Sequence, residues 1–178
     1  LSPVHEGRAV RVRLLGCGTS SGVPRIGNDC GVCGPGEPRN RRSRAAVLVE
    51  AGGQAILIDT GPDLRSQLLE ADVARLDAVI WTHDHADHTH GIDDLRQVYH
   101  ARGRPVDCFA RPATLASLKG RFSYSFEGKE AYPPAVMGHE LPDRLNVNGV
   151  AIRVVDLPHG AVTSAGLRFD WGGASFAY

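Results

Sequence analysis

One short segment constrains the fold of this chain more than any other: residues 82–91, Thr-His-Asp-His-Ala-Asp-His-Thr-His-Gly. It holds four of the eight histidines and begins at the end of the run 78–82, which is nearly all apolar. A short apolar run of this kind predicts a strand that is buried on both faces. Residues 93–101 predict a helix. The fold must therefore place a histidine-rich turn between a buried strand and a helix.

The rest of the chain alternates strand patterns with helix patterns. Apolar and basic residues alternate over 9–15, which is typical of a half-buried strand, and residues 45–50 and 54–59 flank Gly52-Gly53 as a β-hairpin would. Helical spacing predicts that Leu64, Leu68 and Leu69 share one buried face. Further predicted elements are strands at 105–110 and 150–156, a helix at 112–119 and two strands around Gly172-Gly173. This order predicts one α/β layered domain over residues 1–178.

Residues 16–38 contain seven glycines and three prolines and are expected to form a loop. Loops of this length in a compact domain are usually functional or disordered. Four unevenly spaced cysteines do not predict a disulfide scaffold, and a reducing cytoplasm is the expected location. Cys17 and Cys108 are interpreted as small buried residues.

The charge of the chain narrows the classes of function. There are 20 basic and 20 acidic residues, so the basic surplus on which general nucleic-acid binders depend is missing. The balance is uneven, because residues 1–50 sum to +4, residues 51–100 to −6 and residues 101–178 to +2. No apolar run approaches the roughly 18 residues that span a bilayer, and no leader pattern precedes the first strand. We expect no membrane partner.

The histidine-rich segment has the chemistry of a metal site. Neutral imidazoles and carboxylates are ligands that suit zinc, manganese or iron, of which zinc and manganese are favoured here. His83 and His85 are two residues apart, so an extended chain points them the same way. Asp87 and His88 lie where the chain turns into the next helix, and one segment can thus serve two adjacent metals. A solvated loop with capping acids is the alternative, which three histidines and an aspartate within six residues disfavour.

These residues match, letter for letter, the H-x-H-x-D-H signature of the metallo-β-lactamase superfamily, which the sequence resembles. Residues 15–24, 57–61 and 88–96 look like its phosphodiesterase branch. That branch includes the cyclic-phosphate phosphodiesterases of phosphonate breakdown and, more distantly, the tRNA 3′-end processing nucleases. The resemblance runs from about residue 12 to the end of the chain. It implies the four-layer αββα sandwich of the family.

The resemblance also implies roles for individual residues. His83, His85 and His159 would hold the first metal, and Asp87 and His88 the second, with Asp87 also helping to position the attacking hydroxide. Asp59 would be the carboxylate that orients a histidine ligand, its alternative being a strand-end cap.

The family's second site also uses a bridging aspartate and a late histidine, both after the position of His159. Neither is found in residues 160–178, and Asp170 is not a candidate because it precedes a Gly-Gly turn. We expect a chain that is incomplete at its C-terminal end, with a weak or empty second site.

The pair Cys30 and Cys33 has metal-ligand spacing, and relatives carry a structural zinc here on three cysteines and a distant histidine. Asn28 stands where the first of those cysteines would be. With two thiolates and no clear third ligand, a structural zinc on Cys30 and Cys33 is the less favoured interpretation.

The function implied is metal-dependent hydrolysis, in which a metal lowers the pKa of water from near 16 toward about 7. A phosphodiesterase acting on a small nucleotide or cyclic ribose phosphate is the leading hypothesis. A tRNA 3′-end processing ribonuclease is second, since no basic arm is evident, and an inactive metal-binding fragment is a third. The expected partner is the small phosphodiester, with tRNA and a second copy of the chain left open.

Three other features stay ambiguous in the sequence. The basic run 39–44 is slightly favoured as a solvated loop, but Arg41, Arg42 and Arg44 are candidates for binding a substrate phosphate. Aromatic residues alternate over 122–126, which favours a strand face over a lid that stacks on a base or sugar. His90 and His139 are expected in solvated loops.

Overall fold

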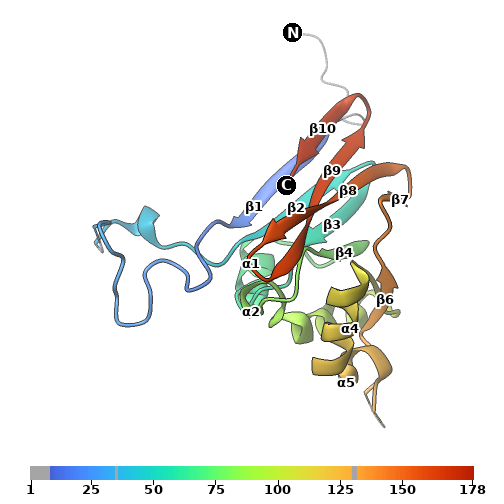
Figure 1. Ribbon diagram of the computed structural model, residues 1–178, viewed down its shortest axis with the longest axis horizontal. Helices are drawn as coiled ribbons and strands as arrows, with labels where there is room; N and C mark the ends of the chain where they lie inside the picture. The colour runs from blue at the N-terminus through green and yellow to red at the C-terminus, as the bar shows by residue number, and fades with distance from the viewer. Residues whose placement is uncertain (1–8, 35, 130–131) are drawn as a thin grey trace.

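The computed structural model describes residues 9–34, 36–129 and 132–178. Two sheets stack face to face, and helices cover the outer face of the larger sheet (Figure 1). The larger sheet has the order β1 (Arg11–Gly16), β2 (Ala46–Ala51), β3 (Gln54–Ile58), β4 (Ala78–Trp81), β5 (Val106–Ala110) and β6 (Val136–Glu140). The smaller sheet has the order β10 (Ala174–Ala177), β9 (Val162–Trp171), β8 (Val150–His159) and β7 (Arg144–Val147).

The helices are α1 (Leu64–Glu70), α2 (Ala86–Thr89), α3 (Leu95–Arg102), α4 (Pro112–Arg121) and α5 (Ser123–Glu127), with 3-10 turns η1 (Pro38–Asn40) and η2 (Ile92–Asp94). The strand and helix predictions for 9–15, 45–50, 54–59, 78–82, 93–101, 105–110, 112–119 and 150–156 are confirmed to within a few residues. The strands predicted around Gly172-Gly173 are β9 and β10. No helix in the described part of the chain is long and apolar enough to cross a membrane.

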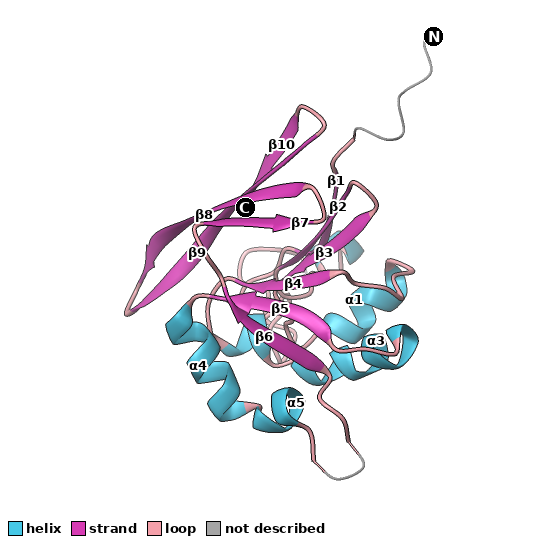
Figure 2. Cartoon of the chain, turned by 90° about the vertical axis from the view of Figure 1, so that its right-hand side faces the viewer, coloured by secondary structure: helices cyan, strands magenta, loops and turns pink. Residues whose placement is uncertain are grey.

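The centre of the larger sheet is buried from both sides. Strands β3, β4, β5 and β6 run parallel, and every residue of β4 is buried, as a doubly covered parallel strand requires. Leu57 and Val79 face the helices. Ile56 and Ile80 pack instead against residues of the smaller sheet. Figure 2 shows the helices on one side of the larger sheet and the smaller sheet on the other. Because parallel strands end at the same edge, the residues that follow β3 and β4 meet there.

The described residues form three of the four expected layers. On the outer face of the smaller sheet no described helix is present, and Val155 and Leu157 of β8 are 58% and 47% exposed there. One layer of helices and two sheets are present, and they are arranged as in the α/β architecture that the resemblance implies.

Two expectations about helices are wrong. Leu69 is 64% exposed, and Gln67 is buried in its place because its amide donates 2.9 Å hydrogen bonds to Ser43 Oγ and the Arg44 carbonyl. The aromatic segment 122–126 forms α5 and not a strand face. Phe122 and Phe126 are four residues apart, so a helix also brings both onto one side, where they pack against the core.

Residues 17–43 form an arm that projects from the body of the molecule (Figure 1). Its base is closed by backbone hydrogen bonds between Val23 and Arg42 at 2.8 and 2.9 Å, and the loop predicted for 16–38 is confirmed. The sulfur atoms of Cys30 and Cys33 are in contact with each other on the arm. No group of three metal-binding side chains includes them within the described ranges. Cys108 is buried as expected, but Cys17 is exposed.

Candidate metal centre

The backbone changes from extended to helical inside the histidine-rich segment. His85 has φ −64° and ψ 151° and precedes α2, which contains Asp87 and His88. His83 therefore lies in the segment between β4 and α2, whereas Asp87 and His88 lie in the single turn of α2. This is the arrangement that the sequence pattern predicts.

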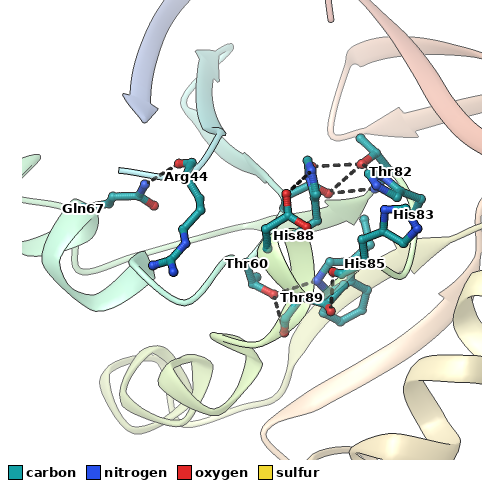
Figure 3. A network of polar contacts seen from close by, with 11 residues as sticks. Arg44, Thr60, Gln67, Thr82, His83, His85, His88 and Thr89 are labelled. Carbon is teal, nitrogen blue, oxygen red and sulfur yellow. Dashed lines mark hydrogen bonds and ion pairs between the residues drawn. The ribbon is translucent and has the colours of Figure 1, made fainter. Parts of the chain in front are cut away.

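Three histidines converge at the edge where the parallel strands end. His83, His85 and His159 each offer one ring nitrogen, and these atoms lie within 4.8 Å of one another. The ring centroid of His83 lies 4.6 Å from that of His85 and 4.2 Å from that of His88 (Figure 3). It also lies 4.6 Å from the ring centroid of His159. His159 arrives from the far end of β8, so the smaller sheet supplies the third member of the group.

His83 carries the clearest sign of a missing partner. Its Nδ1 lies 3.0 Å from Thr82 Oγ1, whereas its Nε2 is buried with no hydrogen-bond partner among the described residues. Leaving such an atom unpaired costs about 1–3 kcal/mol. Burial and the neighbouring histidines lower the pKa of His83 to about 4, which keeps the ring neutral and able to bind a cation. These residues fit a divalent metal.

Asp59 follows β3 and is fully buried, with φ 65°. Its carboxylate accepts hydrogen bonds from the Thr82 backbone N–H at 2.8 Å and from the Thr82 hydroxyl at 2.9 Å. Its Oδ2 lies 2.6 Å from His88 Nδ1. Burial raises the pKa of Asp59, against the opposing effect of its contacts with His88 and Thr82. Asp59 thus directs His88 Nε2 away from itself, toward Asp87 Oδ2 at 3.3 Å.

His88 differs from His83 in the direction of its pKa shift. Burial lowers the pKa of His88, but the contacts with Asp59 and Asp87 outweigh burial, and the net pKa is raised. Without a metal, His88 lies 2.6 Å from one carboxylate and 3.3 Å from another, whereas the three-histidine group contains a ring whose pKa is lowered.

Asp84, which separates His83 from His85, is not aimed at the histidines. Ser117 Oγ donates to Asp84 Oδ2 at 2.6 Å, and Arg121 Nη2 lies 3.3 Å from the same oxygen. These contacts, first of all that with Ser117, lower the pKa of Asp84. His90 and His139 also lie outside the group. His90 is exposed beside the Phe122 ring, and His139 lies in β6, 2.9 Å from Asp107, so the predicted loop position for His139 is wrong.

Two glycines allow the chain around Asp59 to approach α2. The Thr60 N–H donates to the His88 carbonyl and the Gly91 N–H to the Thr60 carbonyl, both at 2.7 Å. A Cβ at Gly61 would fall well inside 3.0 Å of the Asp87 carbonyl oxygen, and one at Gly91 equally close to the Gly61 carbonyl oxygen. No sequence pattern predicts a role for either glycine, although both lie in the segments that carry the family resemblance.

The candidate phosphate-binding arginines divide into two kinds. Arg44 is engaged by Asp63, which accepts from its backbone N–H at 2.8 Å and from Nη1 at 2.9 Å. Arg41 and Arg42 are exposed and have no acidic partner among the described residues. Both line a cavity of about 800 Å³ between the arm and β1.

The two pKa shifts predict how the stability of the metal-free protein depends on pH. The unfolded chain protonates His83 near pH 6.5 and the folded chain near 4, so the free energy of unfolding should fall as the pH drops from 6.5 toward 4. His88 has the opposite sign, because its raised pKa contributes stability that is present below pH 6.5 and lost as the pH rises through its folded pKa.

Urea unfolding of the metal-free protein at pH 4.5, 5.5 and 6.5 measures this dependence. In His83→Gln the loss of stability toward pH 4.5 should shrink, whereas the surface variant His139→Gln should keep it. An unchanged profile in His83→Gln would contradict the assignment of a buried neutral ring.

Comparison with known proteins gives consistent matches. A model of the beta-lactamase superfamily domain matches residues 54–178. An octanoyltransferase of Porphyromonas gingivalis is 42% identical over 126 residues, which are 70% of this chain and 25% of that protein. A ribonuclease Z of Mycobacterium marinum is 32% identical over 157 residues, covering 78% of this chain and 56% of the relative.

Solved structures with a similar fold are also found. A diphosphatase from the PhnP family superimposes with a TM-score of 0.79 at 36% identity, covering 90% of this chain and 63% of that one. Zn²⁺-bound PqqB from Methylobacterium extorquens has a TM-score of 0.72 at 20% identity, with 96% of this chain and 64% of that one covered, and shows the fold alone. The chain spans between a quarter and about two thirds of the length of these relatives. It belongs to the metallo-β-lactamase superfamily, and its likeness to the diphosphatase supports the phosphodiesterase branch of that family.

Proposed function

We propose that this chain is part of a metal-dependent phosphodiesterase that hydrolyses a small nucleotide or a cyclic ribose phosphate. The observation that carries the proposal is the convergence of His83, His85 and His159, with the unpartnered His83 Nε2, beside a second pair formed by Asp87 and His88. We further propose a cytoplasmic protein with zinc or manganese as its metal and the phosphodiester as its partner. A second copy of the chain is an additional candidate partner.

In this proposal the three histidines would hold one divalent ion, and Asp87 with His88 would hold a second ion more weakly. Bound metals supply Lewis acidity, which lowers the pKa of water from 15.7 to about 7 and neutralises charge on the phosphoryl oxygens. Asp59 keeps His88 Nδ1 occupied, so that Nε2 faces the site. Asp87 Oδ2, 3.3 Å from that nitrogen, is available to accept a hydrogen bond from the attacking water.

Loss of the Asp59 charge should weaken the second ligand pair. In Asp59→Asn the buried side chain keeps its size, but an amide no longer gives the Nδ1–H of neutral His88 a charged acceptor that orients the ring and raises the basicity of Nε2, so metal affinity or activity should fall about 10–100-fold. Zinc titration of Asp59→Asn against wild type measures this, with Asp170→Asn as a control on an exposed hairpin. Equal affinities in Asp59→Asn and wild type would contradict the role given to Asp59.

Arg41 and Arg42 are proposed to bind a substrate phosphate, because Asp63 already engages Arg44. Removing Arg42 with Arg42→Ala should raise KM for a phosphodiester about five-fold, equivalent to about 1 kcal/mol, and leave kcat unchanged. The matched control is Arg39→Ala, because Arg39 is paired with Glu37 on the same arm. A fall in kcat at constant KM, or an equal effect of the control, would argue against phosphate binding at Arg42.

One structural observation favours the ribonuclease alternative. The neutral sequence indicates no basic arm, yet the described residues of segment 17–43 project from the body, and this segment has four arginines against two acidic residues. The similarity to ribonuclease Z of Mycobacterium marinum adds support. We therefore keep a tRNA 3′-end processing activity as the second candidate.

A substrate panel separates these candidates. Metal-loaded protein is assayed with bis-p-nitrophenyl phosphate, a 2′,3′-cyclic nucleotide, a precursor tRNA and an octanoyl thioester. Cleavage of the first two supports the proposal, and cleavage of precursor tRNA alone supports the ribonuclease. Cleavage of the thioester without any phosphodiester would overturn both. About one metal per chain with no turnover would indicate an inactive metal-binding fragment.

A further inference from the structure

We propose that α4, together with Arg111 at its N-terminal end, positions all three histidines of the first metal group without contributing a ligand. The inference rests on the proposed metal site. Two polar clamps, one at each end of this ten-residue helix, hold the two chain segments that carry the histidines. A helix of this length is about 15 Å long, so its two ends contact different segments of the chain.

The first clamp is the guanidinium of Arg111, which uses all three of its nitrogens. Nε lies 2.7 Å from Asp156 Oδ1, Nη2 lies 2.8 Å from Asp143 Oδ1, and Nη1 donates to the Leu141 carbonyl at 2.9 Å. The Arg111 side chain is 17% exposed, whereas its partners Asp156 and Asp143 are 56% and 83% exposed, so the guanidinium is shielded from water and the carboxylates are not. The planar guanidinium makes this geometry specific to arginine.

This clamp lies where the strand that carries His159 has least support. Strand β7 pairs only with residues 150–153 of β8, so Asp156 and the residues up to His159 are paired with β9 alone. A two-stranded ribbon is marginally stable by itself. Asp156 is three residues before His159, and the Arg111 ion pair ties this part of the ribbon to the end of β5 and the start of α4. On the other strand, the Ala165 N–H donates to the Thr82 carbonyl at 2.9 Å.

The second clamp is at the C-terminal half of α4. Ser117 and Arg121 hold Asp84. The rings of its two neighbours, His83 and His85, lie 4.6 Å apart within the three-histidine group, so fixing Asp84 on α4 limits the movement of both. One helix thereby sets the relative position of two histidines from the β4 end and one from the β8 end.

Metal titration of four proteins tests the first clamp: wild type, Arg111→Gln, Arg111→Lys and Arg168→Gln. Arg168 pairs with Asp170 at 3.0 Å on β9 of the same hairpin, away from His159, and is the matched control. Cobalt affinity, the visible spectrum of the bound cobalt and the free energy of unfolding without metal are measured for each. Arg111→Gln should bind cobalt about ten-fold more weakly with an altered spectrum, at the lower end of effects seen when ligand-orienting groups are lost. Arg111→Lys should recover part of the affinity, and Arg168→Gln should match wild type.

Asp156→Asn supplies a second route, in case Arg111→Gln fails to fold. It should weaken cobalt binding like Arg111→Gln. The double variant should bind cobalt no more weakly than Arg111→Gln alone, because both substitutions remove the Arg111–Asp156 ion pair. Wild-type affinity and spectrum in Asp156→Asn, or an equal loss in Arg168→Gln, would overturn the inference. A wild-type protein that binds no metal would instead overturn the proposed function on which the inference rests.

Discussion

Replacing His83 by alanine is expected to abolish binding at the first metal group and to reduce phosphodiester hydrolysis about a thousand-fold or more. His83 is the buried member of the three-histidine group and has the unpartnered Nε2. A metal contributes several kcal/mol of transition-state stabilisation, and about 4 kcal/mol corresponds to a thousand-fold in rate. Metal content by mass spectrometry and turnover of bis-p-nitrophenyl phosphate measure the two effects.

His90→Ala is the matched control for this experiment. It removes a histidine from the same segment, but His90 is exposed and lies against Phe122 outside the ligand group. It should retain wild-type metal content and turnover. A His83→Ala protein that still binds one metal at the wild-type affinity would show that the ion is held elsewhere.

The second large effect is expected from Gly91→Ala, which should destabilise the fold by about 3 kcal/mol and lower metal affinity. The added Cβ would meet the Gly61 carbonyl oxygen and the Cβ of Leu64, and a backbone oxygen cannot move aside as a flexible side chain can. Separating these chains would also break the hydrogen bonds that join Thr60 to Gly91 and to the His88 carbonyl. Urea unfolding and zinc titration measure both consequences.

Gly120→Ala provides the comparison. Gly120 lies in α4 and has open space where its Cβ would stand, so alanine should be neutral or stabilise by up to about 1 kcal/mol. If Gly91→Ala were as stable as Gly120→Ala, the close packing of the Asp59 segment on α2 would not be needed for the fold.

Local patterns predicted the part of the site that is continuous in sequence. The apolar run before His83, the two-residue spacing of His83 and His85, and the helix at Asp87 together define where these side chains point, because strand and helix periods are local properties. His159 is different, since only the family resemblance connected it to the other two. Its distance from His83 is set by the pairing of β8 with β9 and by sheet stacking, which no local pattern reports.

The incorrect predictions for Leu69 and for residues 122–126 also arise because local patterns do not report tertiary contacts. Leu69 fits an apolar helical stripe, yet Gln67 is buried because Ser43 and Arg44, more than twenty residues away, supply its hydrogen-bond partners. Phe122 and Phe126 satisfy both a strand period and a helix period, so the pattern alone could not choose between them. The contacts of Asp84 with α4 likewise depend on tertiary packing.

The central claim is that one divalent ion is held by His83, His85 and His159 from two separate segments. Anomalous diffraction at the zinc edge from crystals of the zinc-loaded protein tests it most directly. We expect an ion about 2.0–2.1 Å from one ring nitrogen of each of the three histidines. An ion bound only at Cys30 and Cys33, or no ordered ion beside His83, would contradict it.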